Sequence, residues 1–256
     1  MITPFHILNG DALESHFPEQ ILGEKIIARE CLVDGSVEGL SLSELYETRW
    51  QFLNDNYGDC SRKSYFSKTV SEFEKVQDIP ISSEVNLWFE DDLFCQVNFW
   101  FIINLISQNY QGQTVFLIRP KINSEYSFGS MNKQELVAAF QNRIKIELLE
   151  IKALSQLWNL YRQNDIEEMI KIARRLNDKF PFLEPAINAH KERFPHNERP
   201  GRPSQSLIDI MTEFGSHDFR RVFREFCKLE SIYGFGDLQV RRLFDDIINT
   251  KDSGKP

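Results

Sequence analysis

Short apolar segments alternate with helical patterns over the first 146 residues, and this alternation is the strongest constraint on the fold. The segments with strand character are 5–9, 25–30, 85–89 and 114–118, followed by a shorter one at 144–146. A strand, a helix and a second strand usually form a right-handed crossover in which the two strands are parallel. Residues 1–146 are therefore predicted to form an α/β domain with a mainly parallel, Rossmann-like sheet of four or five strands.

After residue 147 the strand signal ends, and apolar residues recur with helical spacing. The polar segment 195–204 contains three Pro and one Gly, which makes it the best candidate for a linker. Further helical patterns follow this segment. The sequence thus predicts an all-helical region at 147–256, with a helix-turn-helix-like unit at 204–256.

The net charge of −8 is distributed unevenly. Residues 1–149 contain 12 Lys and Arg against 21 Asp and Glu, whereas residues 150–256 contain 18 against 17. An acidic half repels a phosphate backbone, which argues against extended nucleic-acid contact there, and it is compatible with a cation site. In the neutral second half, nucleic-acid binding would need a local basic face.

The four cysteines are far apart and form no Cys-x-x-Cys pair. Cys95 and Cys227 have apolar neighbours and are predicted to be buried thiols. The first residues have neither the basic segment nor the long apolar stretch of a signal peptide. The most apolar helical run, 97–106, is shorter than the roughly 20 residues that cross a bilayer. These features predict a soluble cytoplasmic protein with no membrane partner.

Polar side chains follow four of the predicted strands. In an open parallel sheet, ligands bind outside the carboxyl ends of the strands, so these side chains are candidates for one site. They comprise five carboxylates, two guanidinium groups and an amide: Asn9, Asp11, Arg29, Glu30, Glu90, Asp91, Asp92 and Arg119.

Carboxylate oxygens are the ligands that Mg²⁺ prefers, and Asp11, Glu90 and Asp92 are the candidate metal ligands. Arg29 and Arg119 are candidates to bind a phosphate group of the substrate. A structural interpretation is equally open for single residues, because Asp11 and Asp92 each precede a predicted helix and acidic groups stabilise helix starts. The predicted site also lacks the G-x-G-x-x-G and G-K-[ST] phosphate-binding elements.

Three segments carry a resemblance to a known family: His6–Asp11 (HILNGD), Ala28–Glu30 with Asp34–Gly35, and Leu87–Gln96 (LWFEDDLFCQ). In this order and approximate spacing, the chain resembles a bacterial family described as the domain of unknown function number eighteen thirty-five. Shorter matches near residues 181–183, 193–195 and 236–238 extend the resemblance over most of the chain. Asp91 stands where that family commonly has a His.

The resemblance implies no activity, but it implies that the strand-end residues belong to one site together with Gln96. The candidate catalytic residues are Asp11, Glu30 and Glu90. The candidate substrate-binding residues are Asn9, Arg29, Gln96 and Arg119.

Two functions are compatible with these observations, and the sequence leaves open whether the protein is an enzyme. The first is a ligand-binding α/β domain, such as a metal-dependent enzyme that acts on a phosphorylated or nucleotide substrate. The second is a regulatory protein whose C-terminal helices bind DNA or a protein partner. Basic residues at helical spacing support the second function: Arg220, Arg221, Arg224, Arg241 and Arg242.

Overall fold

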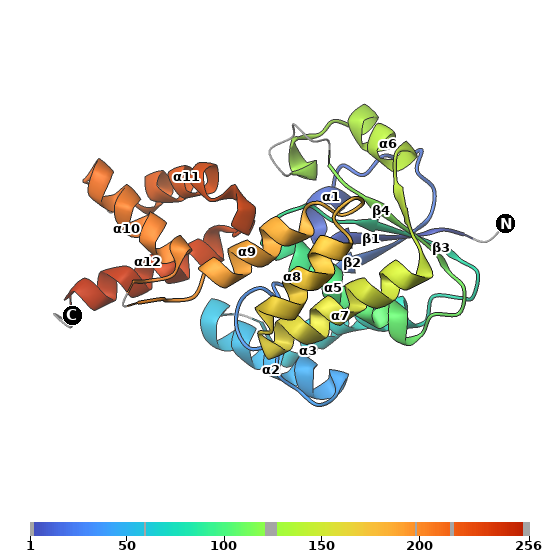
Figure 1. The fold of residues 1–256 in the computed structure, drawn as a ribbon, viewed down its shortest axis with the longest axis horizontal. Coiled ribbons are helices and arrows are strands. Elements are labelled where there is room, and N and C mark those ends of the chain that lie inside the picture. The colour runs from blue at the N-terminus through green and yellow to red at the C-terminus, as the bar shows by residue number, and fades with distance from the viewer. Residues whose placement is uncertain (1–2, 59, 121–126, 198, 216–217, 253–256) are drawn as a thin grey trace.

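The computed structural model describes residues 3–58, 60–120, 127–197, 199–215 and 218–252. At its centre is a five-stranded sheet with the strand order β2-β1-β3-β4-β5 (Figure 1). The strands are β1 (Phe5–Asn9), β2 (Glu24–Ala28), β3 (Glu84–Trp88), β4 (Thr114–Ile118) and β5 (Ile144–Ile146). The first four are parallel, whereas β5 pairs with β4 in the antiparallel direction. The predicted α/β fold with a mainly parallel sheet is thus confirmed.

The helices of the first half are α1 (Asp11–Glu14), α2 (Leu42–Tyr57), α3 (Arg62–Tyr65), α4 (Ser71–Gln77), α5 (Leu93–Gln108) and α6 (Lys133–Gln141). A short π-helix, η1 (Phe66–Val70), and a short 3-10 helix, η2 (Phe128–Ser130), also belong to this half. The second half contains α7 (Leu148–Gln163), α8 (Ile166–Arg175), α9 (Leu183–Glu192), α10 (Arg202–Phe214), α11 (Phe219–Leu229), η3 (Ser231–Tyr233) and α12 (Asp237–Asp252).

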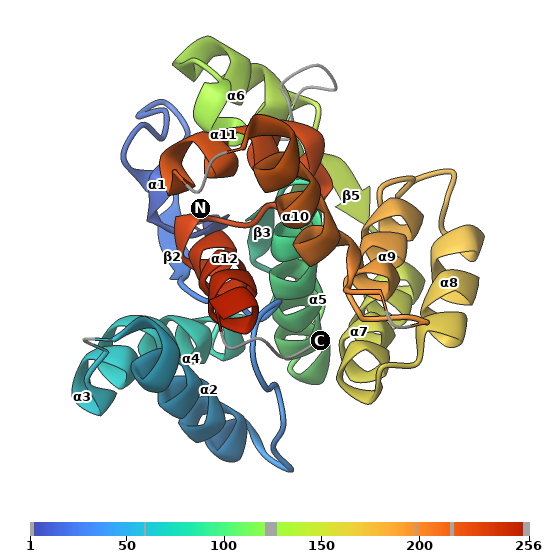
Figure 2. The ribbon, with the colours of Figure 1, turned by 90° about the vertical axis from the view of Figure 1, so that its left-hand side faces the viewer.

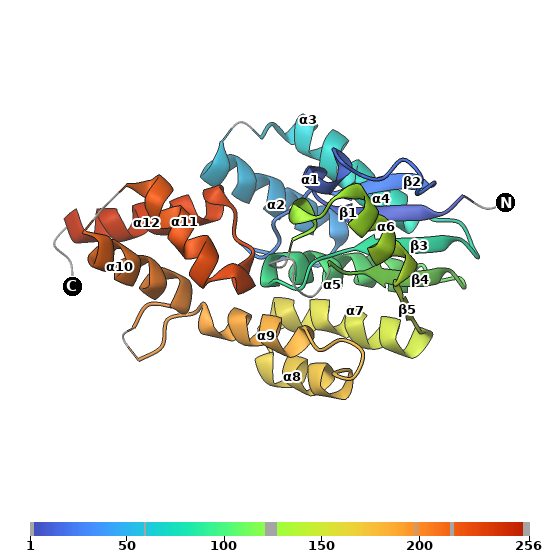
Figure 3. The same ribbon diagram turned by 90° about the horizontal axis from the view of Figure 1, so that it is seen from above.

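Alternate residues of the strands face opposite sides of the sheet, as a strand period of two requires. On β1, Ile7 joins the large core on the side of α4 and α5, while Leu8 joins a smaller core on the side of α1 and α6. Helices α7, α8 and α9 form a further layer beyond α5 (Figure 3). Helix α5 therefore lies between two layers, which explains why nearly all of its residues are buried.

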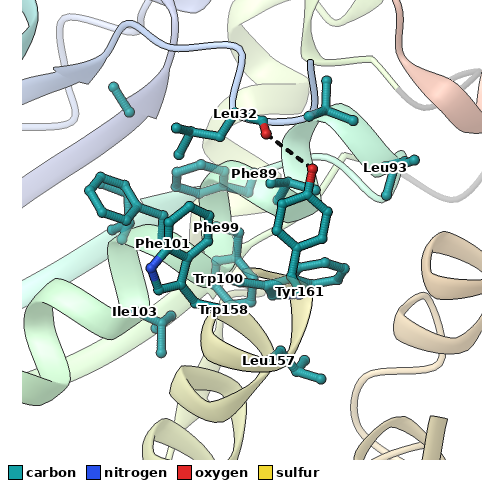
Figure 4. Packing of buried hydrophobic residues seen from close by; sticks show 14 of the residues in the cluster. Leu32, Phe89, Leu93, Phe99, Trp100, Phe101, Ile103, Leu157, Trp158 and Tyr161 are labelled. Carbon is teal, nitrogen blue, oxygen red and sulfur yellow. Dashed lines mark hydrogen bonds between the residues drawn. The ribbon is translucent and has the colours of Figure 1, made fainter. Parts of the chain in front are cut away.

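Aromatic side chains fill the interface between α5 and α7 (Figure 4). The ring centroids of Phe101 and Trp158 are 4.9 Å apart. The hydroxyl of Tyr161 donates a hydrogen bond of 3.1 Å to the backbone carbonyl of Leu32. This interface fixes the helical layer against the loop that follows β2.

In the described residues from 147 onwards, the chain is helical apart from loops and one isolated antiparallel bridge between His196 and Arg199. The predicted domain boundary at residue 146 falls between β5 and α7. Residues on both sides of it belong to one core cluster that extends from Ile7 to Phe244. The division into two domains stays a prediction.

Helices α10, α11 and α12 lie beyond the carboxyl ends of the strands (Figures 1 and 2). Polar contacts attach α12 to the first half of the chain. The guanidinium of Arg242 pairs with the carboxylate of Asp34. The side-chain amide of Gln239 donates to the hydroxyl of Tyr57 at 3.2 Å. These contacts hold the last helices over the edge of the sheet at which the predicted site lies.

Candidate functional site

The ends of β1 and β3 lie side by side where the strand order reverses. The chain passes from β1 to β2 on one side and later to β3 on the other side of β1. In open α/β sheets, such a switch point is where ligands bind. Asn9 ends β1, and Glu90 follows the last residue of β3 by two positions. The structure therefore brings these two predicted site residues to one edge of the sheet.

Asp92 begins α5 as its N-cap residue. One oxygen of its carboxylate accepts a hydrogen bond of 2.9 Å from the backbone N–H of Cys95, so the structural interpretation of this residue holds. The residue is only 2% exposed. Burial raises the pKa of its carboxyl to about 6. Asp92 thus caps the helix and also contributes a buried, easily protonated group to the strand ends.

Cys95 lies at the centre of the strand-end contacts. The side-chain amide of Asn9 donates to its sulfur at 2.9 Å, and the thiol faces Oε2 of Glu90 at 3.8 Å. Burial raises the pKa of this thiol well above its ordinary value, and the carboxylates of Asp92 and Glu90 raise it further. The raised pKa favours the neutral thiol of Cys95 over the reactive thiolate.

Glu90 holds a carboxyl group whose pKa is raised to about 8, first by burial and then by the neighbouring carboxylate of Asp92. A hydrogen bond of 2.6 Å from the backbone N–H of Phe128 to its Oε1 lowers the pKa and so opposes part of this rise. Phe128 belongs to η2, so this bond also fixes the segment after β4 at the edge of the site.

Glu90, Asp92 and Cys95 can each offer one ligand atom, and these atoms lie within 4.8 Å of one another. We call these three residues the strand-end cluster. Two of them were predicted as metal ligands from the sequence, whereas Cys95 was predicted only to be buried. The spacing Glu90-x-Asp92-x-x-Cys95 at a strand-to-helix turn was the signal that could have identified it.

Asp11, the third predicted metal ligand and a predicted catalytic residue, lies outside the strand-end cluster. It is exposed and accepts a hydrogen bond of 2.7 Å from Nε of Arg29. Arg29 also donates to the backbone carbonyl of Lys68 at 3.0 Å. The predicted phosphate ligand Arg29 is therefore engaged within the protein.

Arg119, the other predicted phosphate ligand, forms a two-point ion pair with Asp91. Its Nε lies 2.7 Å from Oδ1, and its Nη2 contacts Oδ2. The guanidinium also lies 4.4 Å from the ring centroid of Phe182. Asp91 thus pairs with Arg119, and neither Glu90 nor Asp92 forms an ion pair with a cation among the described residues.

Glu30, predicted to be catalytic, lies in a buried ion pair with Arg49. Two bonds join the side chains, at 3.1 Å from Nε to Oε1 and at 2.9 Å from Nη2 to Oε2. The hydroxyl of Tyr65 and the backbone N–H of Cys31 also donate to the carboxylate. Its oxygens are therefore satisfied within the protein, and the catalytic role of Glu30 stays a prediction.

Two amide side chains of α5 line the same region. Asn98 donates to Oδ1 of Asn9 at 2.8 Å and to the backbone carbonyl of Glu30 at 2.6 Å. Gln96, predicted to bind substrate, is fully buried and donates to the backbone carbonyl of Glu90 at 2.7 Å. Its Oε1 has no hydrogen-bond partner among the described residues. The sequence did not indicate Asn98 as a site residue, because it lies in the apolar segment that forms α5.

A loop of the C-terminal region lies directly against the strand-end cluster. A Cβ atom placed on Gly234 would come within 1.9 Å of Oδ1 of Asp92, and the φ angle of this glycine is +62°. Only glycine therefore permits this close approach. The loop between η3 and α12 closes one side of the cluster.

Three of the five predicted C-terminal arginines contact other side chains of the protein. Arg242 is paired with Asp34, and the guanidinium of Arg241 lies 3.6 Å from the ring centroid of Phe219. Arg221 lies over the ring of Phe214. The first contact binds α12 to the rest of the protein, so this part of the last helix is covered.

No family model, curated protein or solved structure matches the chain. The resemblance noted from the sequence therefore stays a prediction. Across the described residues, no helix has both the length and the apolar character needed to cross a bilayer.

Proposed function

We propose that this chain is a ligand-binding α/β protein whose strand-end cluster holds a divalent cation. The observation that carries the proposal is the proximity of three potential ligand atoms, from Glu90, Asp92 and Cys95, at the switch point of the sheet. A cation would offset the repulsion between the two carboxylates that raises the pKa of Glu90. The Oε1 of the buried Gln96, which has no hydrogen-bond partner in the described part of the chain, is a second polar group for a ligand there.

The donor set favours Zn²⁺ over the Mg²⁺ expected from the sequence. Mg²⁺ prefers oxygen ligands and usually retains several waters. A thiolate with two carboxylates suits a softer ion such as Zn²⁺. Three protein ligands leave a coordination position for water or for a ligand atom, which is the arrangement of catalytic zinc sites. Catalysis is therefore compatible with the cluster, and an enzymatic role stays a hypothesis.

A phosphorylated or nucleotide substrate has weaker support. Arg29 and Arg119, the residues expected to bind phosphate, are paired with Asp11 and Asp91. A phosphate group would have to displace a carboxylate from one of these arginines. The proposal is therefore restricted to a cation and a small ligand whose class is open.

The test is calorimetric titration of the metal-free protein with ZnCl₂ and, separately, with MgCl₂. We expect Zn²⁺ to bind more tightly and to release protons, because the Cys95 thiol and the Glu90 carboxyl are protonated before binding at neutral pH. Release is measured by repeating the titration in buffers of different ionisation enthalpy. At a free Zn²⁺ concentration of 100 times Kd, binding should stabilise the fold by about 2.7 kcal/mol.

The variants Cys95→Ser and Glu90→Gln should each weaken Zn²⁺ binding at least about tenfold, which corresponds to about 1.4 kcal/mol. The matched control is Asp11→Asn, which removes a carboxylate at the same sheet edge but outside the cluster. Unchanged Zn²⁺ affinity in the Cys95 and Glu90 variants would contradict the proposal. Tight Mg²⁺ binding that is lost in the Asp11 variant would instead support the ligand set expected from the sequence.

A further inference from the structure

A groove between α11 and α12 is separate from the strand-end cluster. Its volume is about 910 Å³. Figure 2 shows α11 and α12 at the end of the molecule that is formed by the C-terminal helices. Its lining includes Phe219, Arg220, Phe223, Arg224, Lys228 and Arg241.

Basic side chains line the groove on two sides. Arg220, Arg224 and Lys228 follow one another at intervals of four residues, so they lie along one face of α11. All three are exposed. Arg220 and Arg224 make no side-chain hydrogen bond or ion pair with any other described residue, and Lys228 pairs with Glu225 at 2.9 Å. Two cations of this face are therefore available to a partner.

The floor of the groove is aromatic. The rings of Phe219 and Phe223 are stacked with centroids 5.7 Å apart, and both residues are only partly buried. The guanidinium of Arg241 of α12 lies over the ring of Phe219, 3.6 Å from its centroid. Cys227, which the sequence predicted to be buried, is exposed at the same groove. That prediction is wrong because α11 is covered by the rest of the protein only on the side of Val222 and Phe226.

We propose that this groove binds an acidic amphipathic helix of a partner protein. Such a helix would place apolar side chains on Phe219 and Phe223 and carboxylates beside Arg220 and Arg224. An amphipathic helix binds by laying its apolar face into a hydrophobic groove. Opposite charges on the rims favour the orientation and the rate of association more than the affinity.

The same groove is less suited to nucleic acid. Asp237 lines it, and Asp245 lies 3.9 Å from the guanidinium of Arg241. The whole chain has a net charge of −8, which repels a long polyanion at low salt. A peptide with a few carboxylates experiences less of this repulsion and can bury the aromatic floor. An acidic protein helix is therefore the occupant that the charge and the aromatic surface of the groove both favour.

The experiment measures fluorescence anisotropy with three labelled probes and the full chain. The probes are a synthetic amphipathic helix of leucine and glutamate, the same helix with lysine in place of glutamate, and oligothymidine. We expect the glutamate helix to bind at least about tenfold more tightly than the other two probes. Its affinity should fall as the salt concentration rises, because exposed ion pairs are screened.

Charge reversal tests the location. The double variant Arg220→Glu and Arg224→Glu should weaken binding of the glutamate helix at least about tenfold, and neither side chain forms a hydrogen bond or ion pair with another described residue that the variant would remove. The control is Arg175→Glu, which reverses an exposed charge on α8, outside the groove. Equal loss in the control, equal binding of both helices, or tighter binding of oligothymidine would each overturn the proposal.

Discussion

The replacement Glu90→Gln should change how the stability of this protein depends on pH. The carboxyl of Glu90 has a pKa near 4.5 in an unfolded chain and about 8 in the folded protein. A pKa that is raised by folding means that the proton is bound more tightly in the folded state. The resulting stabilisation is complete below pH 4.5 and is lost as the pH rises towards 8.

The magnitude follows from these two values. Each pH unit between them corresponds to about 1.4 kcal/mol, so Glu90 alone should lower the free energy of unfolding by about 3 kcal/mol between pH 5 and pH 8. Gln has no proton to lose and can still accept the hydrogen bond from the N–H of Phe128. We therefore expect the variant to gain about 3 kcal/mol relative to the wild type over this range.

The assay is urea denaturation of both proteins at intervals between pH 4 and pH 9, in the presence of a chelator. Asp92→Asn serves as a second variant, because the pKa of Asp92 rises only to about 6 and its effect should end at lower pH. Asn remains a good N-cap, so the start of α5 is retained. Parallel stability profiles of the wild type and the Glu90 variant would refute the reasoning, because they would mean that Glu90 is ionised in the folded protein at neutral pH.

Two further predictions concern stability. Replacement of Arg49 by Met should lower the free energy of unfolding by about 3 to 5 kcal/mol, because the Glu30 carboxylate would remain buried without its cation. Adding Glu30→Gln to this variant should recover part of the lost stability. Urea denaturation of the wild type, the single variant and the double variant checks both expectations. Gly234→Ala should cost more than Gly215→Ala, since both glycines are in the left-handed region, with φ angles of +62° and +54°, but only the first would place a methyl group against Asp92. The Gly215 variant should cost about 1 to 2 kcal/mol, and equal melting temperatures of the two variants would contradict the close approach at Asp92.

The layout of the sheet could be predicted because alternation of strands and helices restricts the topology. The antiparallel direction of β5 could not be predicted from this alternation. This strand has only three residues and lies at the edge. Its apolar pattern is the same in either direction, so pairing with β4 depends on the path of the connecting chain and not on periodicity.

Asn9, Glu90 and Asp92 were placed at one edge from the sequence alone, because parallel strands end at the same side of a sheet. Their partners were harder to identify. Arg49 lies 19 positions from Glu30 on an amphipathic helix, where a basic residue normally faces solvent. Nothing in the local pattern shows that its guanidinium turns inwards, so the ion pair that holds Glu30 could be found only from the fold.

The contact between Gly234 and Asp92 connects the strand-end cluster with the C-terminal region. The helices that carry the α11–α12 groove approach the sheet through this loop and through the pair of Arg242 and Asp34. A cation at the cluster would favour the ionised form of Asp92, the residue on which the loop lies.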